Sequence, residues 1–250
     1  MKITARLSLC TLLLFPALLL AQEDALELTR CQQKYVDGLE RYHGESYRRA
    51  NTLFDDVIRN CAADIERRDS LYLMAGHTKF ALGNYREASI EYEEVLARFS
   101  QSPLREEALF KLGLALYYEA PIVERDIAIL RRAQQRFNRF VATYPNSPYA
   151  DSAQTYLDSI YEKFVEKAMN NAHFYTIIDR YNSAVVYYED ILKSFPETKR
   201  INEVTDSLAR SLIYGQRYAE AEVYIERLQA TSYDEKKVQA LKEMLEKKRE

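Results

Sequence analysis

The chain has 250 residues, a formal net charge of −3, and only six glycines and six prolines. These two residues fall well below their usual shares of about 7% and 5%, which argues against a turn-rich β-sandwich or barrel and favours helices. The near balance of 35 basic and 38 acidic residues excludes the basic excess typical of a nucleic-acid binder. Twenty tyrosines and ten phenylalanines are enough for a large core without a disulfide framework.

Residues 1–21 have the pattern of a secretory signal peptide. Lys2 and Arg6 form a basic start, residues 7–20 are mostly apolar, and Ala21 is a small residue at the expected cleavage site. The apolar run is shorter than the roughly 20 residues that a membrane-spanning helix needs. We therefore predict a secreted mature chain that begins with a short tail, residues 22–32.

An internal repeat decides the fold class. Tyr85, Ala88, Tyr92 and Val95 are spaced by three, four and three residues, which places them on one face of a helix. The pattern recurs four times along the chain. The other sets are Tyr47, Ala50, Phe54, Val57; Leu130, Ala133, Phe137, Phe140; Tyr181, Ala184, Tyr188, Ile191; and Tyr218, Ala221, Ile225, Leu228.

Small residues on a preceding helix complete each repeat. Gly38, Gly76, Ala172 and Ala209 stand nine residues before their sets, and Gly113 takes this role in the third unit. A small residue facing Ala and a ring lets two antiparallel helices approach closely. The pattern resembles the tetratricopeptide repeat, a helix-turn-helix unit of about 34 residues. We predict an all-α solenoid of about five such units.

The repeats divide the mature chain into three regions. Residues 33–148 hold units one to three, residues 149–233 hold units four and five, and residues 234–250 form a charged helix that caps the stack. Ser102 with Pro103, and Ser147 with Pro148, pair a capping hydroxyl with a proline. This pairing predicts that a helix begins at each proline.

The second half carries a narrower resemblance. Residues 136–148 read RFNRFVATYPNSP, and residues 180–198 read RYNSAVVYYEDILKSFPET. With five repeats behind a signal peptide, these segments resemble the outer membrane protein assembly factor family BamD (YfiO-like), over about residues 33–230.

The resemblance implies a non-catalytic periplasmic scaffold at the inner face of the outer membrane. Its implied partners are the periplasmic POTRA domains of a barrel-inserting protein, other subunits of the assembly complex, and unfolded barrel precursors. Units one to three would bind the precursor, and units four and five the inserting subunit.

One family feature is missing at the predicted cleavage site. Members of the family are usually lipoproteins with an acylated Cys directly after the signal, whereas residue 22 here is Gln. Cys10 lies inside the apolar run, with Leu9 before it. We therefore expect the membrane association to run through a protein partner.

No catalytic pattern occurs in the sequence. It has no phosphate-binding glycine loop and no GxSxG, HExxH or CxxC motif. We predict no enzyme activity and no cofactor. Equivalent positions of successive repeats lie on the order of 10 Å apart, so His43, His77 and His173 are too distant to share a metal ion.

Repeat numbering places several aromatic and histidine residues on the inner face of the first three units. This face predicts a groove for an extended or helical peptide, because rings give a large contact area at little entropic cost. Burial of the same rings in the core is the alternative. The candidate residues are Tyr35, Tyr42, His43, His77, Phe80, Phe110, Tyr117 and Tyr118.

In the C-terminal half, Arg180, Tyr187 and Lys193 are candidates for contacting the scaffold partner. Tyr188 belongs to the repeated core pattern, and Tyr187 lies one residue off that face.

Cys31 and Cys61 are the two cysteines of the mature chain. One begins the first helix of unit one and the other ends its second helix. An antiparallel pair brings these ends together, so we predict a disulfide.

A second function remains open from the sequence. A periplasmic adaptor of cell-wall synthesis and division, similar to CpoB of the Tol-Pal system, would also consist of repeats. That family usually has an N-terminal trimerising coiled coil, and no heptad run separates Ala21 from Tyr35.

Overall fold

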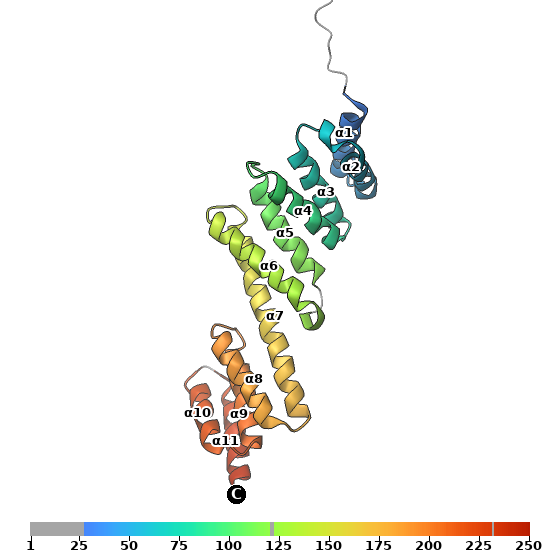
Figure 1. The fold of residues 1–250 in the computed structure, drawn as a ribbon. Helices are drawn as coiled ribbons and strands as arrows, with labels where there is room; N and C mark the ends of the chain where they lie inside the picture. Colours follow the sequence, from blue (N-terminus) through green and yellow to red (C-terminus); the bar gives the residue numbers. More distant parts are fainter. Residues whose placement is uncertain (1–27, 121–122, 232) are drawn as a thin grey trace, which may run out of the picture.

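The computed structural model describes residues 28–120, 123–231 and 233–250, so the predicted signal peptide lies outside the described residues. All regular structure in the described ranges is helical, which confirms the predicted all-α solenoid. Antiparallel helix pairs follow one another along an elongated stack (Figure 1). The helices are α1 Arg30–His43, α2 Tyr47–Cys61, η1 Ala62–Asp64, α3 Arg68–Ala81, α4 Tyr85–Arg98, α5 Arg105–Glu119, α6 Val123–Thr143, α7 Ala150–Ile177, α8 Tyr181–Ser194, α9 Ile201–Tyr214, α10 Tyr218–Gln229 and α11 Glu235–Arg249.

A glycine and a ring hold together each of the first three helix pairs. A Cβ at Gly76 would lie 2.6 Å from the ring of Tyr92, and a Cβ at Gly38 or Gly113 would lie 2.7 Å from the ring of Phe54 or Phe137. All three rings are fully buried. The glycine therefore allows an approach that no other residue permits at this separation.

The turns inside the units also repeat. Four residues with positive φ, namely Glu45, Gly83, Asp179 and Gln216, each stand two positions before the tyrosine that begins the next helix. The N–H of the following residue donates to the carbonyl five residues back, as from Asn84 to Lys79 at 2.9 Å. This is the Schellman arrangement of a helix end. Only Gly83 among the four is a glycine. The hydrogen bonds of the turn hold the other three residues in the left-handed region, which is unfavourable for residues with a side chain.

The Ser-Pro pairs have a different role from the predicted one. Helices α5 and α7 begin at Arg105 and Ala150, two residues after the prolines. The Ser102 hydroxyl accepts from Leu104 N at 3.1 Å, and the Ser147 hydroxyl accepts from Tyr149 N at 3.1 Å. Each Ser-Pro pair therefore forms a turn that precedes the helix, with the proline outside its first position.

Helix α7 is shared between two cores. Ala153, Ile160 and Phe164 pack in the core shared by units two and three, whereas Val165 and Met169 pack in the core of units four and five. The long helix runs continuously between the two parts of the stack (Figure 1). The predicted boundary between residues 148 and 149 therefore lies just before α7. The boundary between the two hydrophobic cores lies inside that helix, between Phe164 and Val165.

The aromatic-Pro-x-Thr ending after α8 packs against the middle of α7. Thr198 is 3% exposed, and its hydroxyl donates to the Glu162 carboxylate at 2.9 Å. The Tyr161 and Phe195 rings meet edge to face, with centroids 5.2 Å apart. The motif therefore anchors the end of unit four on the shared helix.

A disulfide joins the two ends of the first helix pair. Cys31 and Cys61 are bonded, with their Cα atoms 6.3 Å apart and a sequence separation of 30. The bond ties the start of α1 to the end of α2, which is the arrangement expected from repeat numbering.

Helix α11 covers the end of the stack. The Asp234 side chain accepts from Lys236 N at 2.9 Å and caps the helix. Val238, Leu241 and Leu245 are buried in the same core as α9 and α10. Most of its other positions are charged and exposed.

Candidate binding surfaces

The first helices of units one to four carry a set of aromatic and histidine rings, which we call the N-terminal aromatic surface. Its members come from α1, α3, α5 and α7 and are partly accessible to solvent. They are Tyr42, His77, Phe80, Tyr117, Tyr118 and Tyr156.

Tyr118 is the central ring of this surface. Its side chain is 40% exposed, stacks on Tyr85 at 5.4 Å and meets Phe80 edge to face at 5.8 Å. Tyr117 contacts it from the same helix, with centroids 5.4 Å apart. The ring is thus held on three sides and presents the rest of its surface to solvent, which suits an apolar ligand group.

Hydroxyl contacts fix the tyrosines from α7. The hydroxyls of Tyr118 and Tyr156 are 3.1 Å apart, and the Tyr117 hydroxyl is 2.8 Å from the Ser159 hydroxyl. The hydrogen bond with Tyr118, together with burial, raises the pKa of Tyr156 to about 12. Lys163 places its ammonium 4.5 Å from the centroid of Tyr117. The rings are therefore held in place before any ligand binds.

His77 closes the inner face between units two and three. Its Nδ1 is 2.9 Å from the Tyr92 hydroxyl, and its Nε2 is 3.1 Å from the Glu107 carboxylate. The hydrogen bond with His77 lowers the pKa of Glu107 against the opposing effect of burial. With both ring nitrogens engaged, His77 connects α3, α4 and α5. The Tyr42 ring lies 6.4 Å away, at the edge of the same surface.

Three predicted groove residues are placed differently. Phe110 is 5% exposed and packs against Phe140 and Tyr149, so it belongs to the core and cannot form a groove wall. Tyr35 is half-buried, and its hydroxyl donates to Ser70 at 3.0 Å. His43 is exposed and touches Tyr42 edge to face.

Sequence reasoning missed Tyr156 and Lys163. Both lie in the first half of α7, upstream of the segment that matches the repeat. Tyr156 stacks on Phe137 at 5.4 Å, and Phe137 is a member of the repeated pattern. That pairing links α7 to the third unit. The spacing of apolar residues along α7 was the feature of the sequence that could have predicted this contact.

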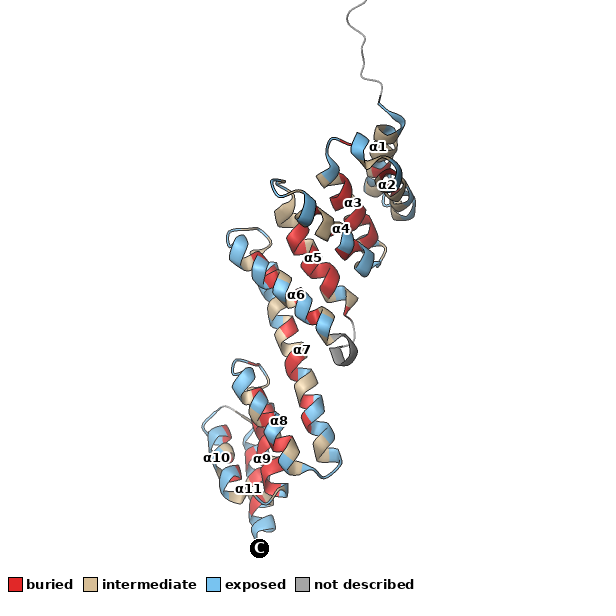
Figure 2. Ribbon diagram, viewed as in Figure 1, coloured by how far each residue is buried: buried red, intermediate tan, exposed pale blue. Residues whose placement is uncertain are grey.

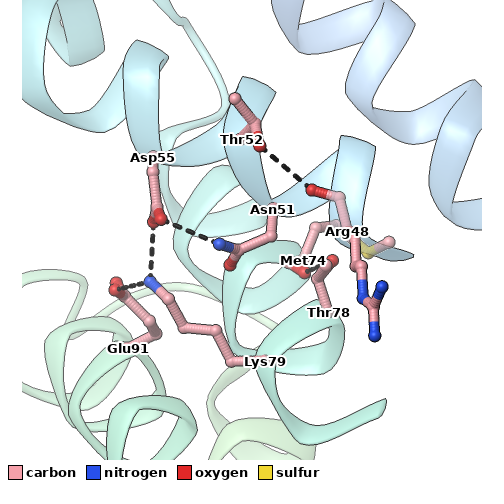
Figure 3. Close-up of polar contacts among 8 residues, drawn as sticks. All are labelled: Arg48, Asn51, Thr52, Asp55, Met74, Thr78, Lys79 and Glu91. Carbon is pink, nitrogen blue, oxygen red and sulfur yellow. Dashed lines mark hydrogen bonds and ion pairs between the residues drawn. The ribbon is translucent and has the colours of Figure 1, made fainter. Parts of the chain in front are cut away.

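A buried lysine links three helices on another part of units one and two. Figure 3 shows Lys79 of α3 pointing toward Asp55 of α2 and Glu91 of α4, at 2.8 and 2.5 Å. Asn51 donates to the same Asp55 carboxylate at 2.9 Å. Burial alone would lower the pKa of Lys79, but the hydrogen bonds and charges of the two carboxylates raise it. The charges of the cluster are paired with one another, so we interpret it as a structural link between the three helices.

In the C-terminal half, exposed apolar side chains gather near the turn between α7 and α8. We call Phe174, Ile177, Ile178 and Tyr187 the turn surface; the first three are 56%, 66% and 46% exposed. Tyr187 is 38% exposed and stacks on Tyr175 at 5.0 Å, and the Phe174 ring meets Tyr175 at 5.6 Å. This is a concentration of apolar surface that an isolated chain would not need.

The three predicted partner contacts do not form one compact group. Arg180 precedes α8 and Lys193 lies in its last turn. Thirteen helical residues span about 20 Å, so these two cations lie at opposite ends of the helix. Of the three, Tyr187 belongs to the turn surface, Arg180 lies at the same end of α8 as the turn, and Lys193 lies at the other end.

Among the described residues, one cluster has ligand atoms close enough for a metal ion, formed by Cys31, Cys61 and Asp64. Both sulfurs in it are bonded to each other. No helix in the described ranges is long and apolar enough to cross a membrane.

The model of the YfiO family, described as outer membrane lipoprotein, matches residues 29–220. The chain belongs to the YfiO family. Among curated relatives, the outer membrane protein assembly factor BamD of Caulobacter vibrioides is 21% identical over 179 residues, which is 72% of this chain and 58% of the relative. BamD of Haemophilus influenzae is 22% identical over 60% of this chain and 63% of the relative. The YfiO-family chain thus spans about three fifths of these relatives.

Solved repeat structures are more distant from this YfiO-family chain. The TPR domain of P58(IPK) is 14% identical, with a TM-score of 0.44, over 86% of this chain and 55% of that one. A thermophilic TPR protein of Thermus thermophilus is 16% identical, with a TM-score of 0.37, over 86% of this chain and 98% of that one.

Proposed function

We propose that this chain is a non-catalytic periplasmic scaffold in the assembly of outer membrane β-barrel proteins. The match of residues 29–220 to the YfiO family carries the proposal, together with relatives named as outer membrane protein assembly factors. The disulfide between Cys31 and Cys61 fits the oxidising periplasm. The protein would act by binding and presentation at the inner face of the outer membrane.

The two surfaces would bind different partners. The N-terminal aromatic surface would hold a segment of the unfolded barrel precursor, because Tyr118 and its neighbours offer apolar area that is already ordered. The turn surface would dock on a periplasmic POTRA domain of the barrel-inserting subunit, since exposed apolar groups at one end of a helix pair suit a protein contact. Precursor and inserting subunit would then be held by one molecule.

Affinity capture from solubilised envelopes tests the proposed role. The tagged wild-type protein is expected to recover the barrel-inserting subunit. Ile177→Asp on the turn surface should reduce that recovery at least about tenfold, because a charge would replace an apolar side chain that the partner covers in the proposed complex. Val223→Asp on α10 is the matched control, since Val223 is 61% exposed and lies off this surface. Recovery of peptidoglycan synthases or Tol-Pal components alone would reject the role.

A peptide from the C-terminal segment of a barrel precursor tests the N-terminal aromatic surface. Tyr118→Ala is expected to weaken its binding about tenfold, because the central ring of the surface is removed. Tyr187→Ala is the control, since Tyr187 has nearly the same exposure and lies on α8. An unchanged affinity, with unchanged thermal stability, would take Tyr118 out of the binding surface.

A further inference from the structure

A pocket of about 430 Å³ lies on the inner side of the C-terminal units, between α7, α8 and α9. It is separate from the N-terminal aromatic surface and from the residues of the turn surface. Six of its lining residues matter for its chemistry. They are His173, Tyr181, Tyr188, Asp206, Arg210 and Tyr214.

The histidine that lines the pocket is bonded differently from the equivalent histidine of unit two. His77 and His173 each follow the small residue of their unit, and Tyr92 and Tyr188 hold the same place in the repeated pattern. In unit two the His77 ring bonds to Tyr92 and to Glu107 on the next unit. In unit four His173 is exposed, and its Nδ1 lies 3.2 Å from the Thr176 hydroxyl of its own helix.

The charges at the pocket leave a cation with unused donors. Arg210 donates from Nε and Nη2 to the two oxygens of Asp206, at 2.7 and 3.2 Å. Its Nη1 makes no hydrogen bond to the described residues. The Asp206 side chain is 12% exposed, and both its oxygens are occupied by Arg210. A guanidinium has five N–H donors in a planar fork, so this arrangement can accept a further carboxylate.

A wall of two rings stands beside this cation. Tyr181 and Tyr214 stack with centroids 5.0 Å apart and planes inclined by 19°. Asp179 accepts from the Tyr181 hydroxyl at 2.6 Å, so this nearby carboxylate is also engaged. Lys248 of α11 adds a second positive charge, with its Nζ 5.3 Å from the centroid of Tyr214. The pocket therefore combines an unused guanidinium donor group with an aromatic wall.

We propose that this pocket binds a peptide segment of a partner protein in which an acidic side chain stands next to an apolar one. The carboxylate accepts from Nη1 of Arg210, and the apolar side chain packs on Tyr181 and Tyr214. Charge complementarity favours this occupant, because the nearby carboxylates Asp206 and Asp179 are already bonded within the protein. The site goes beyond the proposed function, since neither surface assigned there includes these residues.

Binding of two dye-labelled peptides to the mature protein tests the proposal by fluorescence anisotropy. One peptide has a glutamate between a leucine and a phenylalanine, with both ends blocked, and the other has glutamine in place of that glutamate. The acidic peptide is expected to bind at least about tenfold more tightly, and to lose affinity as salt rises, because the contact is charged. Equal affinities, or no saturable binding of the acidic peptide, would overturn the proposal.

Variants locate the binding in the pocket. Arg210→Gln combined with Asp206→Asn removes both charges without leaving a buried carboxylate unpaired, and should weaken the acidic peptide about tenfold. Tyr214→Ala keeps the ion pair between Arg210 and Asp206. It should also weaken binding of the acidic peptide, because one ring of the aromatic wall is removed. Arg98→Gln with Glu94→Gln is the matched control, because it removes another pair spaced by four residues on α4. Unchanged binding in both pocket variants, with circular dichroism showing folded protein, would refute the assignment.

Discussion

Replacing Gly76 by Leu is expected to destabilise the protein by at least about 3 kcal/mol, at the upper end of the cost of overpacking a core. A Cβ alone would lie 2.6 Å from the Tyr92 ring, and that ring is fully buried with its hydroxyl bonded to His77. The ring cannot move without opening the contact between α3 and α4. Urea unfolding followed by circular dichroism measures the loss.

Gly44→Ala is the control for this substitution. Gly44 is exposed at the end of α1, has a φ of −85°, and its added Cβ would approach nothing closer than 3.3 Å. We expect a change within about 0.5 kcal/mol there, as for an ordinary surface position. If Gly76→Leu were equally mild, the close approach of α3 and α4 would not be a requirement of the fold.

Removing the disulfide is expected to cost about 3–4 kcal/mol, by the chain-entropy estimate for a loop of about this length. The variant is Cys31→Ser with Cys61→Ser, which opens the link between the start of α1 and the end of α2. Because each unit of a solenoid contacts only its neighbours, the loosening should concentrate in unit one. Hydrogen exchange should therefore rise in α1 and α2 and stay unchanged in α9 and α10.

Wild-type protein in a reducing agent provides a second measurement of the same effect. It should match the double serine variant in both stability and exchange pattern. Uniform exchange changes along the whole stack, or no loss of stability, would contradict the assigned role of the bond.

The sequence was sufficient for the repeated elements because their signal is local. In every set the second to fourth members are buried, whereas the tyrosines that begin four of the sets are half-buried at the turns. Phe110 was misplaced for a physical reason. Helix α5 packs on α4 and α6 and is buried on most sides, as Figure 2 shows, so its apolar pattern does not reveal an inner face.

Contacts between distant segments could not be predicted in the same way. Tyr156 joins Tyr118 across 38 residues, and its place depends on how far α7 extends before the repeat begins. At the pocket around Arg210, His173 does not have the partners of His77, although both have the same place in the repeat. Repeat numbering gives the position of a side chain but not the partners it finds.

The shared helix α7 bears on how the protein can be divided. Its 28 residues extend about 42 Å. Tyr156 makes its tyrosine contacts in the first half of the helix, and the exposed Phe174 and Ile177 lie at its C-terminal end. A fragment ending at residue 148 would lack Ile160 and Phe164 and would leave the core of unit three open to water. A fragment that starts after residue 148 would instead expose Ile160 and Phe164 of α7, because the helices that cover them would be missing. The two halves are therefore joined by one continuous helix that belongs to both cores, so a cut at residue 148 deprives unit three of part of its own core.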